Sequence, residues 1–198
     1  MTTVWRQDAE AHAGGNMAWN TGVDYRHMLA DSVDTAEVKA LYKAAGLSLD
    51  QDLRALDTAN RVSANPSAVT FMARTSALTG KLAKPQLDVH TTGDGLIPVP
   101  AESALQSGVR RAGSGSLLRE AYVDAPGHCN FTPGETLAAI QTINARVSSG
   151  RWGDTSPAAM NQRAQAADSA DAARYVRDEP APYPRPFTLT PAPRVPRG

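Results

Sequence analysis

The sequence predicts a mixed α/β fold, and three observations support this prediction. Between residues 34 and 80, apolar residues recur at helical spacing in segments that end in turn or stop signals. After Pro85 the pattern alternates as in a β-strand, and a second strand-like run follows a helical segment. Of the 198 residues, 41% are hydrophobic, which is sufficient for one domain with a buried core.

Three helices are expected within residues 34–80. In the first, Asp34 precedes TAEVKALYKAAG, Glu37 completes a capping box and Gly46 marks the end. The second, LDQDLRALDTA, repeats leucine at the spacing of one helical stripe, and the third opens with the Asn-Pro pair of NPSAVTFMARTSAL. Residues 1–33 are expected to form an irregular N-terminal segment.

A strand, helix, strand, helix order is expected after residue 80. The strands are QLDVHTT and LLREAYV, with a helix over residues 99–112 between them. The last helix opens at Thr132 and Pro133, with Glu135 as a capping-box partner, and ends at Gly150. Two strands joined by a helical crossover of this length are expected to be parallel neighbours.

A polar side chain of catalytic type follows each predicted strand. Asp94 comes just after the first strand, and His128 comes just after the second. Because parallel neighbours end at the same edge of a sheet, we expect the two side chains to lie at hydrogen-bond distance. An ionised Asp that accepts the imidazole N–H fixes the histidine tautomer and stabilises the imidazolium formed on proton uptake.

The segments QLDVHTTGDGLIPV and LLREAYVDAPGHCNFTPGET together resemble the C-terminal part of an α/β-hydrolase, over about residues 80–153. The resemblance implies a partial α/β-hydrolase-like parallel sheet over residues 81–153 and a helical cap-like segment over residues 34–80. It implies that Asp94 is the triad acid and His128 the triad base of a serine hydrolase that cleaves an ester, thioester or amide. Leu96, Ile97 and Phe131 flank this pair and are candidates for binding a small-molecule ester or amide substrate.

The nucleophile of that family is not found in this sequence. The strand-turn-helix elbow G-x-S-x-G is absent, and Ser114 and Ser116 of AGSGSLL lie between the acid and the base with the wrong glycine spacing. Cys129 follows His128 directly, so its side chain should point elsewhere, and a buried or half-buried thiol is expected. We therefore expect the chain to be the C-terminal portion of a longer hydrolase, whose N-terminal part would be its partner.

The C-terminal segment, residues 154–198, carries eight prolines, seven of them in EPAPYPRPFTLTPAPRVPRG. Proline removes amide donors and fixes φ, so this Pro/Ala-rich tail is expected to be largely disordered, apart from a short Ala-rich helix within residues 157–175. A second functional hypothesis follows from this composition: a non-catalytic interaction protein, derived from a hydrolase, that binds a partner through its sheet edge and this tail.

Charge and composition exclude several other classes. Twenty basic residues balance twenty acidic ones without a basic block, which disfavours nucleic acid as a partner. The N-terminus lacks the apolar core of a signal peptide and no segment is long enough to span a membrane, so a soluble protein of open localisation is expected. No cofactor is expected. His90 and Asp94 would lie about 13 Å apart along a strand, too far to share a metal ion.

Overall fold

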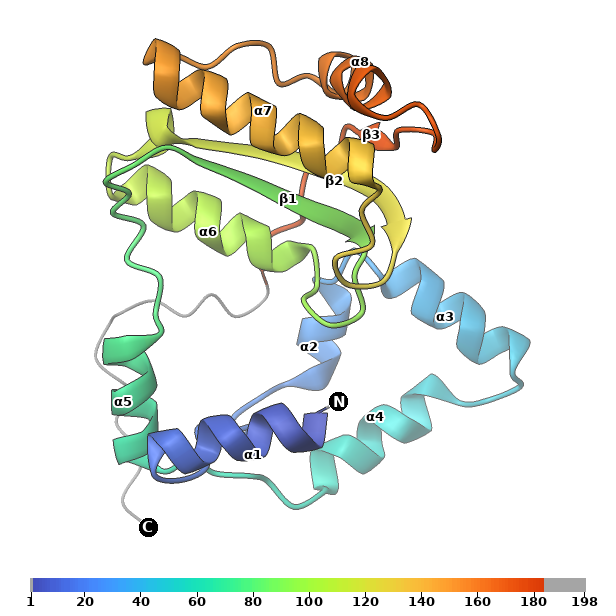
Figure 1. The fold of residues 1–198 in the computed structure, drawn as a ribbon. Coiled ribbons are helices and arrows are strands. Elements are labelled where there is room, and N and C mark those ends of the chain that lie inside the picture. The colour runs from blue at the N-terminus through green and yellow to red at the C-terminus, as the bar shows by residue number, and fades with distance from the viewer. Residues whose placement is uncertain (1, 184–198) are drawn as a thin grey trace. The chain divides into compact units, whose positions relative to one another are not determined.

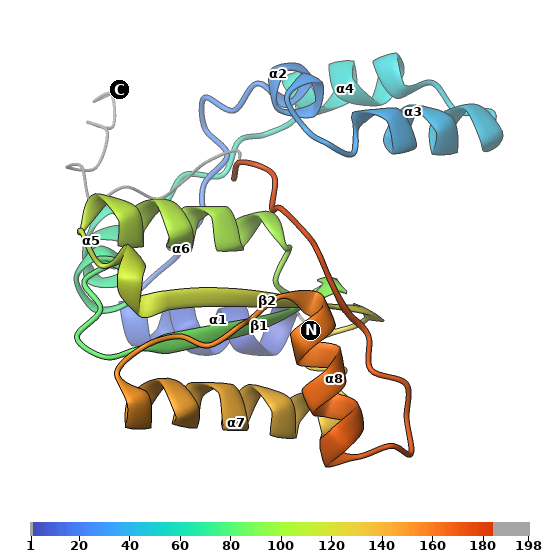
Figure 2. The same ribbon diagram turned by 90° about the horizontal axis from the view of Figure 1, so that it is seen from above.

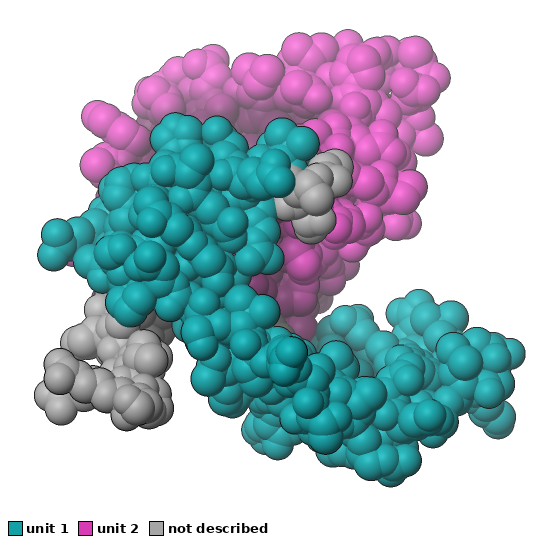
Figure 3. Space-filling model, turned by 90° about the horizontal axis from the view of Figure 1, so that it is seen from below, with its two compact units in different colours: residues 1–77, 184–198 teal, residues 78–183 magenta. Residues whose placement is uncertain are grey.

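The computed structural model describes residues 2–183, which form two compact units (Figure 3). Unit 1 comprises the described residues up to Ala77, and unit 2 comprises residues 78–183. The fold is mixed α/β, which confirms the predicted fold class. No helix among the described residues is long and apolar enough to cross a membrane.

Unit 1 is entirely helical. Its helices are α1 (Thr2–Ala13), α2 (Tyr25–Ala30), α3 (Thr35–Ala44), α4 (Leu49–Thr58) and α5 (Pro66–Thr75). The three predicted helices are confirmed as α3, α4 and α5. Side-chain N-caps from Ser48 and Asn65 begin α4 and α5, whereas Asp34 makes no cap hydrogen bond at α3. The prediction that residues 1–33 are irregular is wrong for α1 and α2, whose sequences lack a clear apolar stripe.

Few apolar side chains are buried in unit 1. Between residues 4 and 77, only Ala13 and Ala68 are buried among the hydrophobic residues. Many large apolar side chains of this unit are exposed: Val4, Trp5, Val33, Leu41, Leu47, Leu56, Val62 and Phe71. The apolar residues whose spacing predicted the helices therefore do not pack into a buried core within the described part of the chain.

Hydrogen bonds to backbone groups hold the loops of unit 1 together instead. Asn20 accepts from the Val62 amide through Oδ1 at 2.6 Å, and its own amide donates to the Val62 carbonyl at 3.0 Å. Asn16 donates from Nδ2 to the Ser63 carbonyl at 2.9 Å, and its carbonyl accepts from the Asn65 amide at 2.7 Å. These contacts tie the loop between α1 and α2 to the loop before α5.

Unit 2 is built on a three-stranded sheet of order β1-β2-β3. β1 (Gln86–Gly93) and β2 (Leu118–Pro126) are parallel, with Asp88 opposite Glu120 and His90 opposite Tyr122, as predicted for neighbours joined by a crossover. β3 (Tyr175–Val176) pairs with β2 in the antiparallel sense. Among the described residues β1 pairs with β2 alone, so β1 is an edge strand.

Helices cover both faces of this sheet (Figures 1 and 2). The crossover helix α6 (Pro100–Arg111) lies on one face, and α7 (Pro133–Ser149) and α8 (Pro157–Ala167) lie on the other. A short 3₁₀ turn, Gly115–Leu117, leads from α6 into β2. Thr132 and Glu135 form the predicted capping box of α7, and Gly150 ends the helix at φ +74°.

The two faces of the sheet differ in polarity because side chains alternate along each strand. The face toward α7 and α8 holds the main apolar core, in which Ala121, Val123, Ala138, Met160 and Ala164 are buried. The face toward α6 has a smaller apolar cluster around Leu105, Val109 and Leu118. Other positions on that face are polar and include Asp88, His90, Glu120 and Tyr122.

The part of the predicted tail that the structure describes belongs to unit 2. The short Ala-rich helix is confirmed as α8, and β3 follows it as a third strand. The prediction of a largely disordered tail is therefore wrong up to Tyr183, because Met160, Ala164 and Tyr175 are core residues that complete the apolar face of the sheet. Residues 184–198, which carry most of the prolines, lie outside the described residues.

We expect Gly134→Ala to destabilise the chain by about 1–3 kcal/mol, the range for overpacking a close contact. A Cβ at Gly134 in α7 would lie 2.7 Å from the Ala164 carbonyl oxygen of α8, and backbone cannot yield as a flexible side chain does. Urea unfolding of the two proteins measures the effect. Gly115→Ala is the matched control, since nothing lies within 4 Å of its added methyl; equal stability of both variants would contradict the close packing of α7 on α8.

Candidate functional site

Asp94 begins the loop that follows β1, and its carboxylate organises that loop. Oδ1 accepts hydrogen bonds from the amides of Leu96 at 2.7 Å and Ile97 at 2.9 Å. This arrangement is a local side-chain turn of the kind that Asp favours. The Asp94 side chain is only 3% exposed, so its second oxygen is held in a fixed, desolvated position.

His128 lies in the loop that follows β2, and two hydrogen bonds fix this loop next to β1. Gly127 adopts φ +86°, which a residue with a side chain rarely tolerates. Its amide donates to the Gly93 carbonyl at 2.9 Å, and its carbonyl accepts from Thr91 Oγ1 at 2.6 Å. The loop after β2 is therefore hydrogen-bonded to the end of β1 at Gly127, the residue that precedes His128.

Asp94 and His128 form a hydrogen-bonded pair. His128 Nδ1 lies 2.7 Å from Asp94 Oδ2, although the residues are 34 positions apart. Burial alone would raise the pKa of the Asp94 carboxyl, but hydrogen bonds from His128 and from the Ile97 and Leu96 amides outweigh it and lower this pKa to about 2. Asp94 is thus ionised and accepts the Nδ1 proton, which leaves Nε2 of a neutral imidazole with a lone pair.

This pair has the properties of a general base backed by a carboxylate. The His128 side chain is 42% exposed, in contrast to the buried Asp94. No described residue occupies Nε2 with a hydrogen bond. An accessible imidazole nitrogen of this kind accepts a proton from a hydroxyl or thiol, and the buried carboxylate stabilises the resulting imidazolium.

None of the nucleophile candidates hydrogen-bonds to His128 among the described residues. Ser114 Oγ instead accepts from the Leu82 amide at 3.2 Å, in the turn between α6 and β2. Cys129 is exposed, which corrects the expectation of a buried or half-buried thiol. Its φ of +55° turns the chain sharply after His128 and leaves the side chain outside the core.

The candidate substrate-binding residues take different positions. The backbone amides of Leu96 and Ile97 bind Asp94, and the Ile97 side chain is exposed. Phe131 is partly buried and packs against the core between the sheet and α7. Their assignment to substrate binding stays a prediction.

His90 is a residue of this site whose contacts the sequence did not reveal. Its Nε2 lies 3.0 Å from the Ile97 carbonyl oxygen and 3.7 Å from Asp94 Oδ2. The expected separation of about 13 Å from Asp94 is wrong, because the chain folds back after Gly93 instead of continuing as a strand. Within residues 2–183 there is still no group of three or more His, Cys, Asp or Glu side chains suited to hold a metal ion.

Two carboxyl groups with buried oxygen atoms, those of Glu102 and Glu120, lie close to His90 between the sheet and α6. Burial, followed by the charge of Asp88, raises the pKa of Glu102 to about 8, and burial raises the pKa of Glu120 to about 7. Glu102 Oε2, Glu120 Oε1 and the Tyr122 hydroxyl are buried and have no hydrogen-bond partner in the protein. The Glu102 and Glu120 carboxyl groups, between the sheet and α6, are therefore protonated to a large extent at neutral pH.

We expect the free energy of unfolding to fall as pH rises from about 5 to about 8, by at least ~1.4 kcal/mol, the equivalent of one pKa unit. Glu102 and Glu120 keep protons in the folded chain that they lose in the unfolded chain, so deprotonating conditions favour unfolding. Denaturant unfolding at several pH values measures the slope. The double variant Glu102→Gln/Glu120→Gln should flatten it; a wild-type slope of zero or of opposite sign would contradict the raised pKa values.

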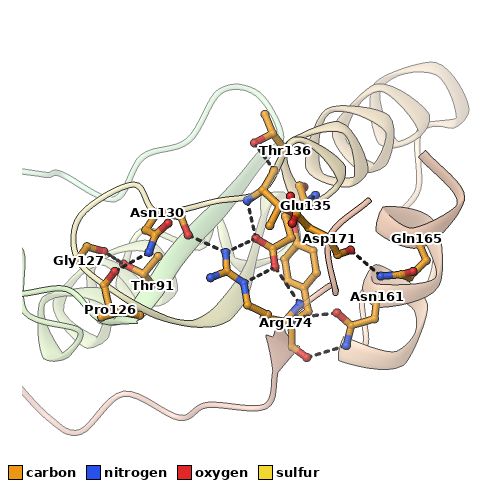
Figure 4. Close-up of polar contacts among 12 residues, drawn as sticks. Thr91, Pro126, Gly127, Asn130, Glu135, Thr136, Asn161, Gln165, Asp171 and Arg174 are labelled. Carbon is orange, nitrogen blue, oxygen red and sulfur yellow. Dashed lines mark hydrogen bonds and ion pairs between the residues drawn. The ribbon is translucent and has the colours of Figure 1, made fainter. Parts of the chain in front are cut away.

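An ion pair between Glu135 and Arg174 helps to hold the loop that contains His128 (Figure 4). Glu135 has a fully buried side chain and binds Arg174, with Oε2 2.9 Å from Nη2 and Oε1 3.1 Å from Nε. Arg174 Nη2 also donates to the Asn130 carbonyl at 2.9 Å, and Asn130 Nδ2 donates to the Pro126 carbonyl at 2.9 Å. The capping-box signal identified Glu135, but nothing local to Arg174 indicated that it reaches back 39 residues.

Comparison with known proteins gives one relationship that bears on this site. Over 169 residues the chain is 30% identical to an o-phthalyl amidase of Xanthobacter agilis, a stretch that covers 84% of this chain and 37% of the amidase. This chain is similar to part of an o-phthalyl amidase. No protein-family model matches the sequence, and no solved structure matches it.

The similarity to the o-phthalyl amidase is not confined to the sheet. The matched stretch is longer than unit 2, so it extends into the helical unit 1 as well. The chain spans a little over a third of the length of the amidase. Both units are thus related to a hydrolase-type protein, over a part of its length.

Proposed function

We propose that this chain supplies the acid and base of a serine hydrolase of the α/β-hydrolase type, with Asp94 as the acid and His128 as the base. The observation that carries the proposal is the 2.7 Å contact between His128 Nδ1 and the buried carboxylate of Asp94, at the adjoining ends of two parallel strands. The similarity to an amidase supports hydrolysis as the reaction and favours an amide over an ester or thioester as the substrate bond.

In this proposal His128 Nε2 takes the proton of a serine hydroxyl as the hydroxyl oxygen attacks the carbonyl carbon of the substrate. The imidazolium then gives the proton to the leaving nitrogen or oxygen, and an acyl-serine forms. Water hydrolyses this ester by the same route, with His128 again as base. Asp94 stays ionised throughout, which agrees with its lowered pKa.

The nucleophile in this proposal comes from polypeptide outside the 198 residues. Two observations support that source. No described serine or cysteine hydrogen-bonds to His128, and the matched amidase has nearly two thirds of its length outside the match. Within residues 2–183 β1 pairs on one side only, and this is the edge at which a strand of that polypeptide would continue the sheet.

Labelling with a fluorophosphonate probe, measured by intact mass, tests the proposal. We expect no adduct on the chain alone, and one adduct on a serine of the partner when the chain is co-expressed with the polypeptide encoded upstream of it. His128→Ala should abolish that adduct while leaving the complex intact. An adduct on the isolated chain that His128→Ala removes would instead place the serine within these residues and refute an external nucleophile.

The second candidate, a non-catalytic interaction protein, rests on the same free edge of β1. It predicts that the chain binds a partner and that the complex reacts with no acylating or phosphonylating probe. The predicted contribution of the Pro-rich tail to such binding falls mainly on residues 184–198, outside the described residues. A stable complex without any adduct, unaffected by His128→Ala, would favour this candidate over the hydrolase.

A further inference from the structure

His90 lies next to Asp94 of the Asp94–His128 pair. It is located near the end of β1, on the face toward α6, and its side chain is 10% exposed. Its Nε2 is 3.0 Å from the Ile97 carbonyl oxygen. Ile97 in turn donates its amide to Asp94 Oδ1 at 2.9 Å. One peptide segment of the acid loop is thus held from both sides, by His90 at its carbonyl and by Asp94 at its amide.

The other nitrogen of His90 faces a carboxyl group. Glu102 lies in the first turn of α6, and its Oε1 is 3.1 Å from His90 Nδ1. A carbonyl oxygen can only accept a hydrogen bond, so the contact with Ile97 requires the proton of His90 on Nε2. In a neutral His90 the Nδ1 atom is then an acceptor, and Glu102 must be the donor.

We propose that His90 is a positioning residue for the Asp94–His128 pair, and that a protonated Glu102 holds His90 in the neutral tautomer that supports the acid loop. The proposal concerns how the pair is held; its connection to catalysis rests on the proposed function. Neutrality of His90 matters because Nε2 is also 3.7 Å from Asp94 Oδ2, the oxygen that binds His128. An imidazolium there would compete with His128 for the same carboxylate charge.

The surroundings of Glu102 support its protonated state. On the strands, Asp88, Glu120 and Tyr122 face α6 together with His90, and from α6 the Gln106 amide donates to Glu120. Among the described residues, no Lys or Arg side chain lies within ion-pair distance of Glu102. The basic side chain that does is His90, which carries a charge only when protonated. Burial, and then the nearby Asp88 carboxylate, raises the pKa of Glu102 to about 8.

The first test is the tautomer of His90 in the wild-type chain. Nitrogen-15 NMR of the histidine rings, measured near pH 6.5 and assigned with His90→Gln, distinguishes Nε2–H from Nδ1–H and from the imidazolium. We expect His90 to carry its proton on Nε2 and His128 to carry its proton on Nδ1. A His90 ring that is protonated on Nδ1, or on both nitrogens, would overturn the proposal without requiring any variant of Glu102.

The second test compares two replacements of Glu102 that differ in one property. Glu102→Gln keeps a donor toward His90 Nδ1, whereas Glu102→Met has a similar length and no donor. The readout is solvent exchange of the His128 Nδ1 proton. We expect a roughly fivefold or greater acceleration in the Met variant, the effect of weakening one hydrogen bond, and wild-type exchange in the Gln variant.

A destabilised control separates positioning from a general loss of stability. Val109→Ala truncates a buried side chain of the same helix, in the separate apolar cluster with Leu105 and Leu118. It should leave exchange of the His128 proton unchanged. Equal acceleration in Val109→Ala and Glu102→Met would reduce the role of Glu102 to stability of the fold and overturn the proposal.

These readouts do not depend on hydrolysis. If the proton exchange follows Glu102 as expected but no partner or probe yields an adduct, the positioning role stands and the proposed function fails. If the assembled protein forms the adduct but exchange and adduct rate are the same in the Gln and Met variants, the proposed function stands and the role of His90 and Glu102 fails.

Discussion

Under the proposed function, Asp94→Asn should lower the rate of hydrolysis by the complex of this chain with the polypeptide that supplies the serine by about four orders of magnitude, the effect of losing the carboxylate in a Ser-His-Asp arrangement. An Asn at this position keeps an oxygen for the Leu96 and Ile97 amides, so the loop remains in place. Its nitrogen, however, donates to His128 Nδ1, which moves the imidazole proton to Nε2. The histidine then has no lone pair toward the nucleophile.

Steady-state hydrolysis of an aryl amide by the complex measures this effect, and Asp124→Asn is the matched control. Asp124 lies near the end of β2 and is exposed, so its replacement should leave the rate within twofold of wild type. In the isolated chain, nitrogen-15 NMR should show the His128 proton on Nδ1 in wild type and on Nε2 in Asp94→Asn. An unchanged tautomer together with a full rate would exclude Asp94 as the acid.

Arg174→Ala should destabilise the chain by about 3 kcal/mol at neutral pH, near the lower end of the range for breaking a buried ion pair. The variant leaves a carboxylate in the core with two amide donors, from Thr132 and from residue 174 itself, but without the guanidinium charge. It also removes the contact between Nη2 and the Asn130 carbonyl, so the His128 loop loses an anchor.

The pH dependence of this variant identifies the charge as the cause. Burial would raise the pKa of Glu135, but the hydrogen bonds from Arg174 and the amides lower it, so its contribution to stability is present above the unfolded pKa of about 4.3 and is lost as pH falls. The difference between wild type and Arg174→Ala should therefore shrink in acid. Arg151→Ala, which removes an exposed arginine, should change stability by less than about 0.5 kcal/mol. A pH-independent loss in Arg174→Ala would point to lost packing instead.

The parts of unit 2 that could be predicted are those whose signals are local. Alternation identified β1 and β2, the Thr132–Glu135 capping box and Gly150 identified α7, and the crossover rule then placed Asp94 beside His128. Each of these inferences needs only a few neighbouring residues or a general rule of chain topology. They located the central pair of the site without any tertiary information.

The elements that were missed depend on distant partners. β3 has only two residues and exists because Tyr175 and Val176 meet Val123 and Tyr122 of β2. Arg174 is important through a carboxylate 39 positions away, and His90 through a fold-back after Gly93 together with the first turn of α6. α1 has no apolar stripe that distinguishes it from a polar loop. Proline content predicted a disordered tail, but Met160, Ala164 and Tyr175, within residues 154–183, are core residues.

The edge position of β1 has a consequence for handling the protein. A strand paired on one side presents backbone donors and acceptors that any other strand can use, including β1 of a second copy. Preparations of the isolated chain should accordingly form larger species as concentration rises, and light scattering over a dilution series would detect them. A polypeptide that occupies this edge would suppress the self-association, so solubility alone would serve as a screen for the partner that the proposed function requires.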